Sequence, residues 1–473
     1  MKNLKSKLTL IFSIATFTIA AQQLPTNSTW EGKVSGIPIN LKITIDSLTK
    51  KQNAEFDSPS QGAFGLKVSD LQIKGDSLTA ISAVIGGGFK GKFNAAKTEI
   101  VGKWMQRGQE LPMNLTKVAN KEQLKRPQTP KAPFPYASED VIYYNADKSI
   151  KYGATLTLPK SEKLSPAVIL ITGSGQEDRN ETIFRHQPFW VIADYLSRNG
   201  IAVLRVDDRG VGQSTGDVMN ATSLDFANDV LVSIDYLKTK NQVDKRKIGL
   251  IGHSEGGMIA PLAAIKSKDV AFIVSMAGVG VIGADILITQ QSDALKKSGA
   301  SADDHKRLLA LSVMMIKLSA KYPVKEKLKA EFNKSFNLWL TQQPKDFLKR
   351  NGFEGTDNQK LVNNLAARFY IPWMRYFMTY DPSLTLPKLS IPILAINGEK
   401  DVQVNAEANL NGFKKYLMQA GNKNSKTILF PNLNHLFQNA KTGDVSEYLS
   451  IEETISTEVL NVITEWIKVQ AVN

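Results

Sequence analysis

The chain has 473 residues, of which 42% are hydrophobic and 22% are charged, a composition typical of globular domains with a large packed core. It contains no cysteine, which excludes disulfide frameworks, thiolate metal sites and cysteine nucleophiles, and it contains only four histidines. The 59 basic and 45 acidic side chains give a net charge of +14, so nucleic acid must be weighed as a partner. At about 150 residues per domain, the length predicts about three folding units.

Residues 1–21 have the features of an export signal. Three lysines lie within the first seven residues, and an uncharged, mostly apolar stretch of 14 residues follows, from Leu8 to Ala21. A membrane-spanning helix needs about 20 apolar residues, so this stretch is too short to be one. Small residues suit cleavage after Ala20 or Ala21. We therefore expect a periplasmic or extracellular protein with no stable membrane anchor once the signal is removed, and a mature charge of 14 − 3 = +11.

Residues 22–119 predict a small antiparallel β domain that resembles a barrel or a sandwich. Apolar and polar residues alternate from Ile39 to Ile45, which is the pattern of a strand with one buried face. Turn-forming clusters separate further short strands that we predict at 66–73, 89–93, 99–104 and 111–115. This part of the chain contains no histidine and no clustered carboxylates, so we expect no catalytic role for it.

A proline-rich segment at 120–135 is predicted to be a linker, because closely spaced prolines favour extended backbone. From residue 136 to residue 473, apolar strand-like runs alternate with helical segments, which predicts a parallel sheet covered by helices on both faces. The runs lie at 167–172, 201–206, 248–251, 271–276, 391–396 and 427–430, and the helical segments at 188–198, 223–240, 254–266, 406–420 and 451–469. The alternation stops between about 282 and 386, where helical patterning with many aromatic residues predicts an inserted cap.

The segment Gly252-His253-Ser254-Glu255-Gly256-Gly257 carries the most specific chemical signal. It contains G-x-S-x-G between an apolar strand and a helix, where the glycines permit a sharp turn that exposes the serine hydroxyl. Ser254 is therefore the predicted nucleophile. A serine hydroxyl becomes reactive only when a base accepts its proton, and an acid must orient that base.

Two histidines follow Ser254 in the sequence, in agreement with the chain order of nucleophile, acid and base that accompanies this motif. His305 lies in a charged patch of the cap, where we expect a solvated side chain. His435 follows the last strand-like run and is the predicted base. The remaining two, His186 and His253, are expected to have packing roles.

The acid is expected after the strand-like run at 391–396, where Asp401 and Glu399 are the two candidates and Asp401 is preferred. Backbone N–H groups must stabilise the oxyanion that forms on the substrate. We assign one to Glu255, directly after the nucleophile, and one to Ser174 in the glycine-rich loop after 167–172, with Gly175 as its alternative. The glycine-rich segment 207–214 lacks the ending of a phosphate loop, so Arg209 is expected to form a structural salt bridge.

Taken together, these residues resemble exported α/β-hydrolases of the EstD type of bacterial carboxylesterase, along nearly the whole mature chain. The resemblance is carried by the segments 57–63, 104–108, 133–136, 155–159, 172–179, 207–212, 252–257 and 434–437. It implies an α/β-hydrolase fold and esterase activity on short acyl chains, with Ser254, Asp401 and His435 as the triad. The sheet also looks like that of serine aminopeptidases.

The prediction is a serine carboxylesterase that acts on a small-molecule ester and needs no cofactor or metal. A peptidase that uses the same triad is an alternative, although an aminopeptidase binds a cationic amine and the cap between Ala284 and Leu386 carries 16 − 10 = +6 charges. A non-catalytic binding protein is a second alternative. Nucleic acid binding is not expected, because the basic residues are dispersed and no recognition motif accompanies them.

Overall fold

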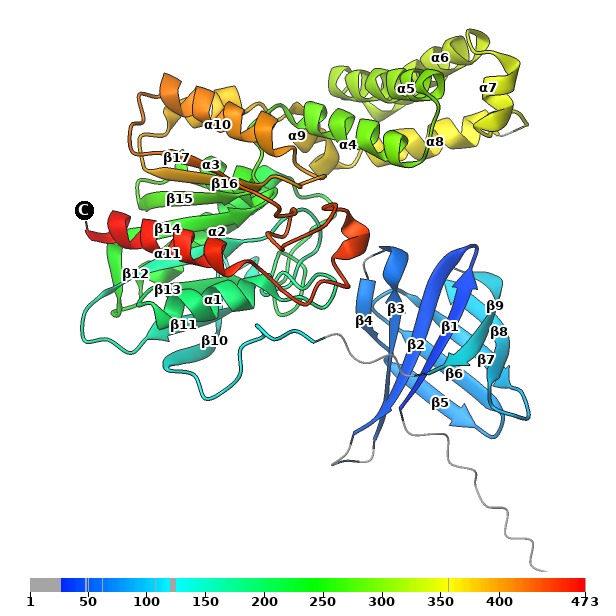
Figure 1. Cartoon of the computed structure of the whole chain (residues 1–473), viewed down its shortest axis with the longest axis horizontal. Coiled ribbons are helices and arrows are strands. Elements are labelled where there is room, and N and C mark those ends of the chain that lie inside the picture. Colours follow the sequence, from blue (N-terminus) through cyan, green and yellow to red (C-terminus); the bar gives the residue numbers. More distant parts are fainter. Residues whose placement is uncertain are drawn as a thin grey trace, which may run out of the picture. The chain divides into compact units, whose positions relative to one another are not determined.

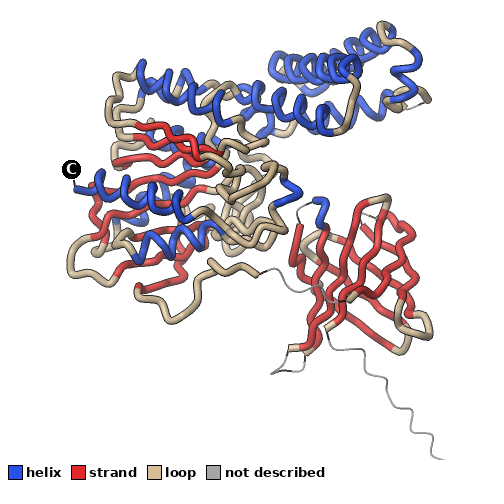
Figure 2. The backbone as a smooth tube through the Cα atoms, viewed as in Figure 1, coloured by secondary structure: helices blue, strands red, loops and turns tan. Residues whose placement is uncertain are grey.

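The computed structural model describes residues 27–119 and 125–472, except for 47, 48, 50, 62, 107 and 356. The predicted export signal at 1–21 lies outside the described residues. The chain divides into two compact units at the boundary between Glu122 and Gln123. Figure 1 shows the elements of both units, and Figure 2 distinguishes the first unit, which consists mainly of strands, from the mixed one. None of the described helices combines the length and the apolar character needed to cross a membrane.

The first unit is a single antiparallel sheet of nine strands that curls into a half-barrel. Its strand order is β4-β3-β2-β1-β9-β8-β7-β6-β5, so β9 lies at its centre and pairs with β1. Alternate side chains form its core, among them the fully buried Trp30, Leu41 and Phe89. The strands are β1 (Ser28–Val34), β2 (Ile37–Ile45), β3 (Gln52–Ser58), β4 (Ala63–Lys67), β5 (Asp70–Lys74), β6 (Ser77–Ser82), β7 (Gly87–Phe93), β8 (Glu99–Gln106) and β9 (Gln109–Val118).

The second unit is built on an eight-stranded sheet with the order β10-β11-β13-β12-β14-β15-β16-β17. The six strands β12 to β17 run parallel to one another, whereas β10 and β11 pair in antiparallel fashion at one edge of the sheet. Parallel strands end at the same edge of a sheet, so the loops after β12, β14, β16 and β17 lie together there. The strands are β10 (Tyr136–Tyr144), β11 (Lys151–Pro159), β12 (Ser165–Ile171), β13 (Ala202–Val206), β14 (Val243–His253), β15 (Val270–Met276), β16 (Ile393–Gly398) and β17 (Lys426–Phe430).

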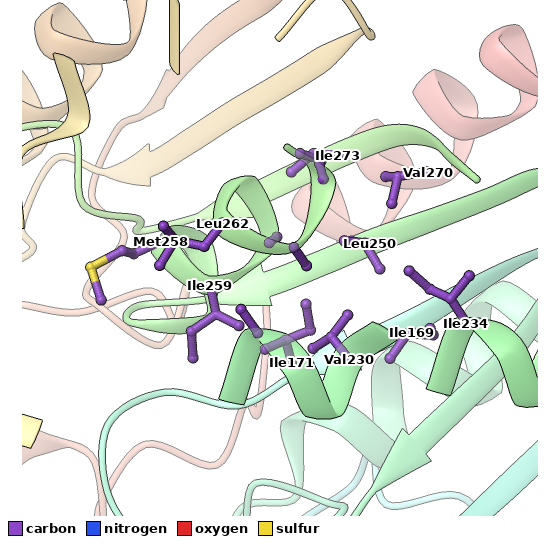
Figure 3. Packing of buried hydrophobic residues seen from close by; sticks show 14 of the residues in the cluster. Ile169, Ile171, Val230, Ile234, Leu250, Met258, Ile259, Leu262, Val270 and Ile273 are labelled. Atoms are coloured by element: carbon purple, nitrogen blue, oxygen red, sulfur yellow. The ribbon is translucent and has the colours of Figure 1, made fainter. Parts of the chain in front are cut away.

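Helices cover both faces of this sheet, because its strands are apolar on both sides. The helices α2 (Ser223–Lys238), α3 (Gly256–Ala264) and α10 (Ala406–Gln419) pack on one face, and α1 (Pro188–Arg198) and α11 (Thr457–Val472) pack on the other. Figure 3 shows Met258, Ile259 and Leu262 of α3 among buried side chains of the strands and of α2. This packing holds the start of α3, and with it the turn that precedes α3, against the sheet.

A helical cap lies between β15 and β16 in the sequence. It consists of α4 (Gly283–Lys297), α5 (Ala302–Lys321), α6 (Lys325–Thr341), α7 (Lys345–Arg350), α8 (Asn358–Phe369) and α9 (Pro372–Thr379). Part of the cap has an aromatic core of its own, in which Phe332, Phe336, Trp339 and Phe347 are buried. The aromatic residues that distinguish this region of the sequence therefore pack mainly with one another.

The last helix begins later than the sequence pattern predicts. We expected a helix over 451–469, but α11 begins at Thr457 and the preceding residues are not helical. The side-chain oxygen of Gln128 accepts the N–H groups of Thr454 and Ile455, and its amide donates to the carbonyl of Ile455 at 2.7 Å. These contacts occupy backbone groups that a helix would need, so the prediction of the helix start was wrong.

Candidate active site

Ser254 lies on a sharp turn between β14 and α3. Its φ is +54°, a conformation that costs a non-glycine residue about 1–3 kcal/mol and recurs at functional sites. Its backbone N–H donates to the carbonyl of Met276 at 2.8 Å, which fixes the turn against the next strand. A Cβ atom added at Gly252 would lie 2.0 Å from the carbonyl of Gly256, so the turn closes only around a glycine at that position.

The predicted acid and base contact each other. Asp401 follows β16 and His435 follows β17, and the Oδ2 atom of Asp401 lies 2.7 Å from the Nδ1 atom of His435. The other carboxylate oxygen of Asp401 accepts the N–H groups of Gln403 and Val404, both at 2.8 Å. The side chain of Asp401 is 0% exposed and that of His435 is 5% exposed, so the pair is shielded from water. This contact fixes Nδ1 as the proton donor to Asp401 and leaves Nε2 available as a base.

Glu399, the alternative acid, takes a different position. Its side chain is exposed and accepts the backbone N–H of Asn432 at 3.0 Å. The structure therefore brings Asp401, and not Glu399, to the imidazole of His435. The catalytic roles of Ser254, Asp401 and His435 stay predictions from the sequence.

The loop after β12 lies directly beside the nucleophile. A Cβ atom added at Gly173 would lie 3.4 Å from the Cβ atom of Ser254. The N–H of Gly173 donates to the Oε1 atom of Glu181 at 2.9 Å. In the part of the chain that the structure describes, the N–H groups of Ser174 and Glu255 have no acceptor, so both remain available to a substrate oxygen. Their assignment as oxyanion donors remains a prediction.

The side chain of Glu255 is buried beneath the turn, where it contacts the cap. Its carboxylate accepts the hydroxyl of Ser223 at 2.6 Å and the indole N–H of Trp373, in α9, at 2.8 and 2.9 Å. Burial raises the pKa of Glu255 to about 7, although these hydrogen bonds favour the ionised form. Sequence reasoning missed Trp373, because nothing in the local pattern connects residues that are 118 positions apart.

Two further acidic side chains near the loop after β12 titrate close to neutrality. Burial and then the charge of Glu181 raise the pKa of Glu177 to about 8. Burial also raises the pKa of Asp208 to about 7, although Thr172 and the N–H of Glu177 donate to its carboxylate at 2.6 and 3.0 Å. Both carboxyl groups therefore keep their proton to a higher pH than an ordinary carboxyl does.

The other histidines and Arg209 take the following places. His305 is half-buried on α5, with its Nε2 atom 3.1 Å from the hydroxyl of Ser292, so it is less solvated than predicted. His186 is buried and hydrogen-bonded, and Arg209 pairs with Asp229 at 2.7 Å. His253 is buried beside the ring of His435, and its Nδ1 atom also lies 2.9 Å from Oε1 of Glu181. Among the described residues, no three histidine or acidic side chains are placed to hold a metal ion.

The sheet topology and the turn at Ser254 define an α/β-hydrolase, the fold class that the sequence predicts. The sequence model of a family described as serine aminopeptidase, S33, matches residues 183–347. This range includes the turn at Ser254 and the first part of the cap, and it ends before Asp401 and His435.

The resemblance to α/β-hydrolases of the EstD type is also confirmed. Esterase EstD of Thermotoga maritima is 26% identical to this chain over 311 residues, which cover 66% of this chain and 64% of that protein. The match therefore spans less than two thirds of the length of Esterase EstD.

Two solved structures are similar to part of this chain. The α/β hydrolase GrgF from Penicillium has a TM-score of 0.43 and 17% identity, and the alignment covers 71% of this chain and 100% of that one. The Pyrococcus furiosus esterase Pf2001 has a TM-score of 0.42 and 15% identity, with 74% of this chain and 99% of that one covered.

Proposed function

We propose that the protein is an exported serine carboxylesterase that hydrolyses short-chain acyl esters, acetyl esters among them. The observation that carries this proposal is the 2.7 Å contact between Asp401 and His435, on the loops where a hydrolase with Ser254 as its nucleophile needs an acid and a base. The similarity to Esterase EstD supports the choice of an ester as the substrate. The charged and apolar pattern of residues 1–21 supports export.

In the proposed reaction, the hydroxyl oxygen of Ser254 attacks the ester carbonyl carbon while Nε2 of His435 takes the hydroxyl proton. The carbonyl π electrons move to oxygen, which accepts hydrogen bonds from the N–H groups of Glu255 and Ser174. The intermediate collapses, the bond to the alcohol oxygen breaks, and the alcohol leaves with the proton from His435. Asp401 stabilises the imidazolium through its hydrogen bond to Nδ1.

The resulting acyl-enzyme is hydrolysed by the same groups. His435 takes a proton from water, and the hydroxide attacks the acyl carbon. The bond to the oxygen of Ser254 then breaks, and the proton returns to that oxygen. The products are one carboxylic acid and one alcohol, and no external oxidant, reductant or cofactor enters the balance.

A panel of p-nitrophenyl esters from acetate to palmitate tests the reaction and the acyl length. We expect kcat/KM to be highest for acetate or butyrate and to fall for long chains. Ser254→Ala should lose turnover and labelling by a fluorophosphonate, whereas wild type should keep both. A wild-type protein that is folded but neither labelled nor active on any ester would overturn the proposal.

Aminoacyl and prolyl anilides form the second arm of the same panel, because the matching family is described as serine aminopeptidases. The carboxylates of Glu255 and Asp208 are already engaged by protein donors and so are poorly placed to bind a substrate amine. We therefore expect a higher kcat/KM on esters than on anilides. The reverse ratio would assign the triad to a peptidase.

A further inference from the structure

His253 precedes the predicted nucleophile, and its imidazole contacts an acceptor at each nitrogen. Its Nδ1 atom lies 2.9 Å from the Oε1 atom of Glu181, and its Nε2 atom lies 3.0 Å from the backbone carbonyl oxygen of His435. A backbone carbonyl can only accept a hydrogen bond, so Nε2 must carry a proton. Oε1 of Glu181 also accepts the N–H of Gly173 at 2.9 Å, which favours the carboxylate form. All of these contacts are satisfied when the proton between Glu181 and His253 lies on Nδ1 and the imidazole is charged.

His186 provides a contrast within the same unit. It is also buried, and its Nε2 atom lies 2.9 Å from the carbonyl of Tyr448 and 3.0 Å from the amide nitrogen of Gln438, but its Nδ1 atom faces the hydroxyl of Thr454 at 3.0 Å. A hydroxyl can donate as well as accept, so the contact of Nδ1 does not require a second proton on this ring. Burial lowers the pKa of His186 to about 4, in agreement with a neutral ring. The partners, and not burial alone, distinguish the two histidines.

The ion pair joins three loops that hold predicted catalytic groups. Glu181 binds the loop of Gly173, which abuts Ser254 and precedes Ser174. His253 belongs to the turn of Ser254 and binds the backbone of His435, whose ring centroid lies 4.8 Å from its own. Glu181 itself has a φ of +52° although it is not glycine, which is backbone strain of the kind retained at functional sites.

We propose that His253 and Glu181 are positioning residues: a buried imidazolium–carboxylate pair that holds the loops of Gly173 and His435 in register with Ser254. The pair acts through its neighbours and does not touch the substrate. Its effect on turnover rests on the proposed function, whereas its charge state does not.

The charges around His253 favour the imidazolium. Glu181 and Glu177 face it from the loop after β12, Asp401 from the loop after β16, and the imidazole of His435 from the loop after β17. Glu181 and Asp401 favour the imidazolium, whereas Glu177, with its own pKa raised to about 8, contributes little charge at pH 7. Burial alone would lower the pKa of His253, but the charge and hydrogen bond of Glu181 outweigh burial and raise the pKa to about 9. Loss of the Nδ1 proton would leave a lone pair against the carboxylate, so the connection between the loops should break at alkaline pH.

Nuclear magnetic resonance of the 15N-histidine-labelled protein tests the charge directly. With four histidines in the chain, single variants His186→Gln, His253→Gln and His305→Gln assign the signals. At pH 7 we expect His253 to show two slowly exchanging ring N–H protons and the nitrogen shifts of an imidazolium, with a transition near pH 9, while His186 is neutral. A neutral His253 at pH 7 would overturn the proposal, whether or not the protein hydrolyses esters.

Glu181→Gln tests the positioning role, because it keeps the shape of the side chain and removes its charge. We expect kcat on the preferred ester to fall tenfold or more, KM to change less than threefold, and the alkaline limb of the pH profile to move at least one pH unit toward neutrality. His186→Gln is the matched control for disturbing a buried histidine, and it should keep the wild-type alkaline limb. A Glu181→Gln protein with the wild-type limb and kcat would contradict the proposal.

If Glu181→Gln does not fold, the charge measurement on wild type still decides the protonation of His253. The decline of wild-type kcat/KM above about pH 9 then reports the positioning role, and constant activity to pH 10.5 in a folded protein would contradict it. Absence of ester hydrolysis by wild type would reject the proposed function and the positioning role together, and the resonance experiment would then show whether the charged pair exists.

Discussion

The indole N–H of Trp373 donates to both carboxylate oxygens of Glu255, at 2.8 and 2.9 Å. Trp373 belongs to the last helix of the cap, and Glu255 directly follows Ser254. The cap is thus attached to the turn that presents the predicted nucleophile and one predicted oxyanion donor. A change in the position of α9 would therefore act directly on the turn of Ser254 through Glu255.

Trp373→Phe should separate this contact from the packing of the aromatic ring. Phenylalanine keeps most of the apolar surface but removes the donor to Oε2 of the buried carboxyl, while Ser223 still donates to Oε1, and an unsatisfied buried group costs about 1–3 kcal/mol. We expect lower thermal stability and a lower kcat, measured by calorimetry and on the preferred ester. Trp466→Phe, in α11 on the other face of the sheet, is the control and should change stability with little effect on kcat.

Glu255 should also make stability depend on pH. Its pKa is raised from 4.5 to about 7 in the folded protein, so the folded state retains a proton that the unfolded state has already lost. Its stabilising effect is therefore complete below about pH 4.5 and is lost as the pH rises to about 7. Urea unfolding between pH 4.5 and 8 measures the slope of the free energy of unfolding against pH. Glu255→Gln should reduce this slope by the equivalent of about one proton.

Glu177 and Asp208 have raised pKa values as well, so part of the slope should survive in Glu255→Gln. The exposed Glu139 offers a matched control, since Glu139→Gln should leave the slope at its wild-type value. An unchanged slope in Glu255→Gln would mean that this carboxyl ionises normally in the folded protein.

The choice of acid can be tested with two conservative variants. Asp401→Asn should keep the fold but remove the charge that orients and stabilises the imidazolium, with a loss of about 10³- to 10⁴-fold in kcat. Glu399→Gln should retain wild-type kcat, because this exposed side chain contacts the backbone of Asn432 and not His435. If Glu399→Gln were the inactive variant, the assignment of the acid would be wrong.

The predicted oxyanion donor in the loop after β12 is a backbone group, so only a residue without an N–H removes it. Ser174→Pro should lower kcat about 10²- to 10³-fold, whereas Ser174→Ala, which keeps the N–H, should stay close to wild type. Circular dichroism and fluorophosphonate labelling would establish that the proline variant still folds. Equal kcat for the two variants would reject Ser174 as a donor and leave Gly175 as the candidate.

Features that depend on neighbouring residues could be predicted from the sequence, whereas features that depend on contacts between distant residues could not. Ser254, Asp401 and His435 each follow an apolar strand, and this local pattern made them candidates whose catalytic roles stay predictions. The pattern left Glu399 as an alternative to Asp401, and only the folded chain shows which of the two contacts His435. The helix start at Thr457 was misplaced because Gln128, more than 300 residues earlier, occupies the preceding backbone. Trp373 and Glu181 have no local signature, since each is defined by a partner that only the folded chain brings close.

The contacts of Arg126 and Gln128 have a consequence for the order in which the chain folds. Arg126 donates to the carbonyl oxygens of Leu449 and Ile451, and Gln128 binds Thr454 and Ile455, all more than 320 residues later. Apart from the contact between Arg126 and the carbonyl oxygen of Phe184, these contacts form only when almost the whole chain is available. When the chain leaves a ribosome or a translocation pore with its N-terminus first, this segment stays without these partners until the end of the chain follows. Contacts between residues so far apart in the sequence form slowly.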